Sequence, residues 1–98
     1  FYYLSELTKV IRERKRTLPE GSYVASLLKK GRVGILKKIG EEAFETALAS
    51  LTRRRSRLIS ELADLWFHIL VLMAAEGVSL EDVLKELKRR KGKRRKTG

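Results

Sequence analysis

The chain has 98 residues, of which 43% are hydrophobic, and its 23 Lys and Arg against 12 Asp and Glu give a formal net charge of +11. A chain of this length builds one modest core, and its apolar content is too high for a disordered protein. It contains no cysteine and one histidine, which excludes a disulfide scaffold, a catalytic thiolate and metal sites built from cysteine or from several histidines.

The first half of the chain predicts helices, because apolar residues recur every three or four positions. A first helix is expected over residues 3–16, and residues 17–21 (TLPEG) break it with a proline and a glycine. Ser22 is expected to cap a short helix over residues 23–30, which Gly31 ends. A longer helix is then expected from residue 33 or 34 to about residue 53.

The second half of the chain continues the helical pattern. Residues 53–57 (RRRSR) are expected to form a polar turn, and the most apolar helix follows over residues 58–76, closed by Gly77. Ser79 and Asp82 fit a capping box that opens a last helix. Short connections favour antiparallel neighbours, so the predicted fold is an all-α bundle of four main helices plus a short one.

The positive charge is concentrated at the end of the sequence. Residues 88–96 read KRRKGKRRK, and without these eight basic side chains the net charge falls from +11 to +3. We therefore expect a folded domain over residues 1–87 and a basic, flexible tail over residues 88–98. Nonspecific contact of this tail with nucleic acid is the less favoured alternative, because the tail has no aromatic residue to stack on bases.

A polar stripe runs along the most apolar helix. Of residues 58–75, 14 of 18 are apolar, and Glu61, Asp64 and His68 lie within about 60° of one another at helical spacing. Burying a carboxylate is costly unless it is paired or binds a metal. The stripe therefore needs a compensating partner.

The preceding helix carries a second group of carboxylates. Glu41, Glu42 and Glu45 share one arc, and Lys37 and Lys38 lie one turn earlier. By themselves these residues are typical of a solvated face in which glutamates pair with lysines.

An antiparallel hairpin of the two helices would bring Glu42 and Glu45 against Glu61 and Asp64. Four converging carboxylates require a cation, and ligands that are all oxygen select a hard one. Mg²⁺ is the expected metal, with Mn²⁺ as an alternative. The basic residues near this hairpin suit a polyphosphate substrate.

Four segments together resemble a known family. They are residues 19–23 (PEGSY), residues 37–45 (KKIGEEAFE), residues 61–68 (ELADLWFH) and residues 77–83 (GVSLEDV). In combination they resemble the phosphoribosyl-ATP pyrophosphohydrolases of histidine biosynthesis, a branch of the all-α, MazG-like nucleotide pyrophosphohydrolases.

The resemblance implies an enzyme that hydrolyses 1-(5-phosphoribosyl)-ATP to 1-(5-phosphoribosyl)-AMP and pyrophosphate, the second step of histidine biosynthesis. It implies Mg²⁺ dependence, a MazG-like helical bundle and a homodimer. The alternative is a MazG-like house-cleaning pyrophosphohydrolase of noncanonical nucleoside triphosphates. We expect a cytoplasmic protein without a membrane segment, because no uncharged apolar run in the sequence reaches the roughly 18 residues that a membrane helix needs.

These expectations assign roles to seven residues. Glu42, Glu45, Glu61 and Asp64 are expected to hold the metal and to be catalytic, and Glu41 is expected to support activation of the attacking water. Lys37 and Lys38 are expected to contact substrate phosphates. Spacing leaves open which carboxylate is the base and which are ligands.

The apolar helix also predicts assembly. A helix that is apolar on almost every side must be covered all round, which a small monomer cannot do. We assign the uncovered side to some of Trp66, Leu70 and Met73, and expect two chains to pair through this helix with two-fold symmetry.

Overall fold

The computed structural model describes the backbone of residues 2–97 and the side chains of residues 2–91. Four helices follow one another: α1 (Tyr2–Thr17), α2 (Tyr23–Leu51), α3 (Arg55–Glu76) and α4 (Leu80–Thr97). The described part of the chain contains no strand. The predicted all-α class and helix order are confirmed, whereas completion of the bundle by dimerisation stays a prediction.

Helix α2 consists of two helical pieces. Gly31 has φ 83° and ψ −177°, outside helical geometry, and glycine adopts this positive φ without the steric cost that a side chain would bring. At the start of α2, the Ser22 side chain accepts a hydrogen bond from the Ala25 N–H at 3.2 Å. The predicted cap and the predicted short helix are both confirmed.

The turn between α2 and α3 is shorter than expected. Helix α3 begins at Arg55, with Arg54 as its N-cap residue, so the second half of residues 53–57 is helical. Arginine is a good helix former, and a basic run without glycine or proline does not stop a helix. Arg53 makes the reversal instead, with φ 58°.

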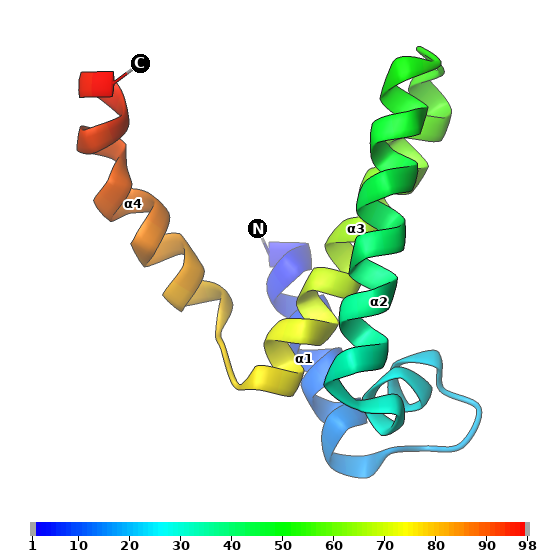
Figure 1. The fold of residues 1–98 in the computed structure, drawn as a ribbon. Helices are drawn as coiled ribbons and strands as arrows, with labels where there is room; N and C mark the ends of the chain where they lie inside the picture. The colour runs from blue at the N-terminus through cyan, green and yellow to red at the C-terminus, as the bar shows by residue number, and fades with distance from the viewer. Residues whose placement is uncertain (1, 98) are drawn as a thin grey trace.

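The core lies at one end of the α2–α3 hairpin. Helices α2 and α3 pack side by side along most of their length, and α1 packs on both of them near the kink of α2 and the C-terminal half of α3 (Figure 1). The core residues come from these three helices: Ile11, Val24, Leu27, Ile35, Leu70, Val71 and Ala74. The other end of the hairpin extends beyond this core.

The uncovered side of α3 differs from the expected one. Trp66 is 52% exposed, as expected, but Leu70 is only 2% exposed and belongs to the core. Met73 is partly buried and packs against the same core. Including Leu70 in the uncovered side was wrong, because α1 and the short first piece of α2 cover this half of α3. The exposed large apolar residues of α3 lie between its N-terminus and its middle, toward the hairpin turn: Ile59, Leu62 and Trp66.

Helix α4 is separated from α3 by two local signals that the sequence predicted. Gly77 takes the left-handed conformation as the C-cap of α3. The Ser79 N–H donates to Asp82 Oδ2, and the Asp82 N–H donates to Ser79 Oγ, both at 3.0 Å. The capping box is therefore confirmed.

Helix α4 then runs apart from the other three helices and continues to Thr97 (Figure 1). The side chains of residues 92–98 of the expected tail lie outside the described residues. The domain boundary after residue 87, the flexibility of the tail and its contact with nucleic acid stay predictions.

By length and composition alone, α3 is long and apolar enough to cross a membrane. Core helices of soluble proteins meet the same criteria. In the structure α3 packs against α1 and α2, and 17% of its apolar 18-residue stretch is buried.

Candidate functional site

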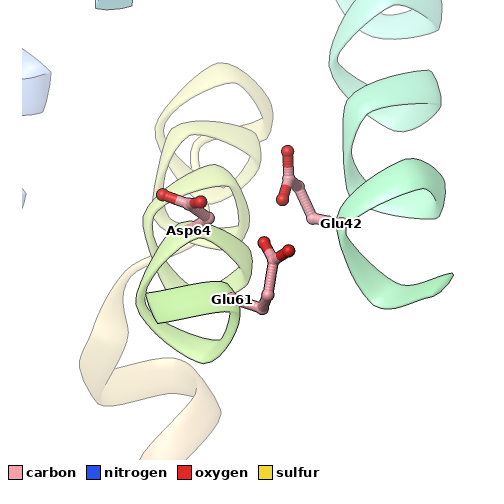
Figure 2. Close-up of side chains that lie close together, drawn as sticks. All are labelled: Glu42, Glu61 and Asp64. Carbon is pink, nitrogen blue, oxygen red and sulfur yellow. The ribbon is translucent and has the colours of Figure 1, made fainter. Parts of the chain in front are cut away.

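Three carboxylates meet across the α2–α3 hairpin. Glu42 on α2 faces Glu61 and Asp64, which lie one turn apart on α3 (Figure 2). One oxygen from each lies within 4.8 Å of the other two. Glu42 and Glu61 are partly buried, and Asp64 is exposed. We call Glu42, Glu61 and Asp64 the carboxylate triad.

Two basic side chains flank the triad. Lys38 Nζ lies 3.5 Å from the Glu42 carboxylate and 3.8 Å from Glu41. On the other side, Arg57 Nε lies 3.8 Å from the Glu61 carboxylate. The triad is thus compensated by one cation from each helix.

Lys38 is held in its charged form. The electrostatic influence of the nearby Tyr23 side chain is the largest cause that raises the pKa of Lys38, and the carboxylates of Glu42 and Glu41 raise it further. Lys38 is therefore a cation at neutral pH at the edge of the triad.

The other predicted site residues lie around the triad. Glu45 is not in the carboxylate group, because its carboxylate faces Arg57 Nη2 at 3.4 Å. Glu41 is exposed and pairs with Lys38. Lys37 is exposed, and no ion pair of its side chain is found within residues 2–91. The structure thus brings together three of the four expected ligands and places one lysine and one supporting glutamate beside them.

One polar residue beside the site was not identified from the sequence. The Tyr23 hydroxyl lies 2.8 Å from His68 Nε2, and His68 sits one turn after Asp64 on the same stripe. Tyr23 belongs to the PEGSY segment, 45 residues earlier in the chain. Membership in that segment was the only feature of the sequence that could have pointed to Tyr23. Local patterns do not predict a contact between two distant parts of the sequence.

The donor set of the triad fits a hard divalent cation. It offers carboxylate oxygens only, from two helices, and one member is open to solvent. Mg²⁺ in enzymes is commonly held by one or two carboxylates together with substrate phosphates and water. The described site has both the oxygen ligands and the open side that such an arrangement requires.

Comparison with known proteins agrees with this chemistry. Residues 4–91 match the family described as phosphoribosyl-ATP pyrophosphohydrolase. The chain is 54% identical over 87 residues to the phosphoribosyl-ATP pyrophosphatase of Metallosphaera sedula, covering 89% of this chain and 94% of that protein. It is 49% identical over 88 residues to the phosphoribosyl-ATP pyrophosphatase of Saccharolobus solfataricus, covering 90% and 94%.

Proposed function

The chain belongs to the phosphoribosyl-ATP pyrophosphohydrolase family and hydrolyses phosphoribosyl-ATP in histidine biosynthesis, and we propose that this reaction takes place at the carboxylate triad. The observation that carries the proposal is the meeting of three carboxylates from two helices within 4.8 Å. Like charges at this separation repel one another; Lys38 and Arg57 offset part of this repulsion, and a bound cation would offset it further.

We propose Mg²⁺ as the cation, with Glu42, Glu61 and Asp64 as its protein ligands. When bound, Mg²⁺ supplies charge neutralisation on the leaving pyrophosphate and a more acidic water as nucleophile. Mn²⁺ prefers the same oxygen ligands and is the expected substitute.

The surrounding side chains would bind and orient the substrate. Lys38 lies at the edge of the triad and would donate to a phosphate oxygen as negative charge builds on the leaving group. Lys37 is exposed on the preceding position and would contact the same polyphosphate chain. Glu41 would accept a hydrogen bond from the attacking water, because its carboxylate lies beside Lys38 and outside the triad.

Glu45 is the candidate fourth ligand. It lies one turn from Glu42 on α2, and its carboxylate would have to leave Arg57 to join the triad. An exposed ion pair of this kind contributes about 1 kcal/mol or less. Its loss on metal binding would therefore cost little.

We also propose a homodimer formed through the end of the hairpin that extends beyond the core. Several large apolar residues are exposed on this end of α2 and α3: Phe44, Leu48, Leu51, Ile59, Leu62 and Trp66. A group of apolar side chains on one part of a small protein is typical of an interaction surface. A two-fold pairing of the same face would bury them in both chains.

The substrate identity follows from the family. The relatives are named for phosphoribosyl-ATP, which supports this substrate over the noncanonical triphosphates of the wider superfamily. A cytoplasmic location is inferred from the role of the family in amino-acid biosynthesis.

A pyrophosphate-release assay tests the proposed site. Phosphoribosyl-ATP is incubated with the protein with and without Mg²⁺, beside a panel of nucleoside triphosphates. Asp64→Asn is expected to lower kcat/KM at least about a hundredfold, which corresponds to about 3 kcal/mol of lost transition-state stabilisation. Because Asp64 is exposed, the helical content should be unchanged.

The matched control is Glu81→Gln, which removes an exposed carboxylate from α4, away from the triad. It should leave activity unchanged. Full activity of a folded Asp64→Asn protein would contradict the assignment of the triad as the active site.

A further inference from the structure

His68 uses both of its ring nitrogens. It is only 4% exposed, although it lies on the polar stripe beside the triad. Its Nδ1 atom lies 2.7 Å from the backbone carbonyl oxygen of Asp64, and its Nε2 atom lies 2.8 Å from the Tyr23 hydroxyl. The imidazole therefore joins the turn of α3 that carries Asp64 to the first residue of α2.

The direction of each hydrogen bond follows from its partners. A carbonyl oxygen only accepts, so Nδ1 must carry the proton and donate to Asp64. In the neutral imidazole Nε2 then has a free lone pair, and the Tyr23 hydroxyl donates to it. The hydroxyl of Tyr23 thus selects the tautomer that can bind the Asp64 carbonyl.

Tyr23 is placed for this role by contacts of its ring. The ring stacks on Phe67 with 6.0 Å between ring centroids and an interplanar angle of 22°, and it meets the edge of His68 at 5.7 Å and 87°. These ring contacts do not involve the hydroxyl, so the Tyr23 ring should keep its position when the hydroxyl is removed. The Ser22 cap fixes the backbone of α2 directly before Tyr23.

Asp64 is the member of the triad that depends on such support. Lys38 contacts the Glu42 carboxylate, and Arg57 contacts the Glu61 carboxylate. Within residues 2–91 the Asp64 carboxylate has neither an ion pair nor a hydrogen bond, and it is exposed. Its direction is therefore set by the backbone of its own turn, to which His68 is hydrogen-bonded.

We propose that Tyr23 and His68 act as positioning residues that hold the turn of Asp64 in the geometry that binds the divalent cation. This inference rests on the proposed function of the triad as a metal site. Groups that orient a ligand from outside the coordination sphere commonly change metal affinity by 10- to 100-fold when they are removed. The pair would act through Asp64 and would not touch the substrate.

The test compares two variants that each remove one phenolic hydroxyl. Tyr23→Phe keeps the ring that stacks on Phe67 and leaves His68 Nε2 without its donor. Tyr3→Phe is the matched control, because Tyr3 is 76% exposed on α1. The probe is Mn²⁺ alone, titrated into the protein and followed by electron paramagnetic resonance. Tyr23→Phe is expected to weaken Mn²⁺ binding on the order of tenfold, and Tyr3→Phe to leave it unchanged.

Two further variants separate positioning from simple structural support. The His68→Asn amide can still donate at the place of Nδ1 and keep the Asp64 contact, whereas the longer His68→Gln side chain can only reach Tyr23. We expect His68→Asn to retain tighter Mn²⁺ binding than His68→Gln. We also expect Tyr23→Phe to raise the Mn²⁺ concentration for half-maximal activity more than it lowers kcat at saturating Mn²⁺.

The outcomes distinguish this inference from the proposed site. If the unmodified protein binds Mn²⁺ and Tyr23→Phe binds it equally well, positioning by the pair is wrong and the metal site stands. A lower melting temperature of Tyr23→Phe with unchanged Mn²⁺ affinity would also overturn it, since the pair would then be structural only. If the unmodified protein does not bind Mn²⁺, both the metal site and the positioning role are wrong.

Discussion

Arg57 Nη2 on α3 lies 3.4 Å from the Glu45 carboxylate on α2, and Nε of the same guanidinium lies 3.8 Å from Glu61. One arginine thus contacts a member of the triad and the candidate fourth ligand. Both side chains of the Arg57–Glu45 pair are nearly half exposed, so the pair contributes little to stability. Its position predicts that Arg57 would compete with the proposed cation for the same carboxylates.

Removing Arg57 should therefore tighten metal binding. Arg57→Ala takes away a positive charge within about 4 Å of two carboxylates, which raises the attraction for a divalent ion. We expect Mn²⁺ to bind about threefold to tenfold more tightly, with a loss of unfolding free energy below about 1 kcal/mol. Calorimetric titration with Mn²⁺ measures the affinity.

Arg55→Ala is the control for this prediction, because it removes the same charge from the exposed start of α3. An equal gain in affinity for both variants would show that net charge, and not contact with Glu45 and Glu61, is responsible.

Leu70 should be a residue of the folding core. Its side chain is 2% exposed and belongs to the cluster with Ile11, Leu27 and Val71. Leu70→Ala leaves a cavity there, and we expect the free energy of unfolding to fall by about 2–5 kcal/mol. Urea denaturation followed by circular dichroism measures the loss. Leu87→Ala, which removes the same atoms from an exposed position on α4, should change it by much less.

Trp66 tests the proposed dimer without disturbing the core. The side chain is 52% exposed, so Trp66→Glu should leave the fold of each chain intact while placing a charge in the proposed interface. A buried, unpaired charge is strongly unfavourable, and light scattering should show a shift from dimer to monomer. Tyr3→Glu, on an exposed aromatic of α1, should not shift it. A monomeric unmodified protein at micromolar concentration would contradict the proposal.

Acid should loosen α4 before it unfolds the core. The Ser79 N–H, and then its hydroxyl, lower the pKa of Asp82, and hydrogen bonds from Arg89 and Arg90 lower the pKa of Glu86 to about 2. Carboxylates whose pKa is lowered in the folded state stabilise it above their usual pKa, and this contribution is lost as the pH falls through the lowered value. We therefore expect the helicity of α4 to fall between about pH 5 and about pH 2.

Carbon chemical shifts of residues in α4, recorded across this pH range, measure the change. Asp82→Asn should weaken the N-terminal cap of α4 at neutral pH. It should also reduce the change in α4 helicity between neutral and acid pH. Glu81→Gln, which removes a carboxylate outside the capping box, should leave the response unchanged. A pH-independent α4 in the unmodified protein would contradict this account.

The helix ends and the acidic stripe of this protein could be predicted from its sequence, because they depend on local chemistry. Ser22, Gly31 and the Ser79–Asp82 capping box were predicted correctly, because a cap or a positive φ depends on neighbours within about four residues. The spacing of Glu61 and Asp64 placed them on one face of α3 for the same reason, since helical geometry fixes positions three apart.

Tertiary structure decided which residues meet across the hairpin. Glu42 and Glu45 are equivalent by spacing, but the register of α2 against α3 brings Glu42 into the triad and Glu45 to Arg57. The position of α1 likewise buries Leu70 and leaves Trp66 exposed, although both are large apolar residues of one helix. The sequence by itself determined the helices, their caps and the acidic stripe, because these depend on local hydrogen bonds and helical periodicity. The candidate ligand set and the uncovered face depend on how distant segments pack, and only the folded chain specifies that packing.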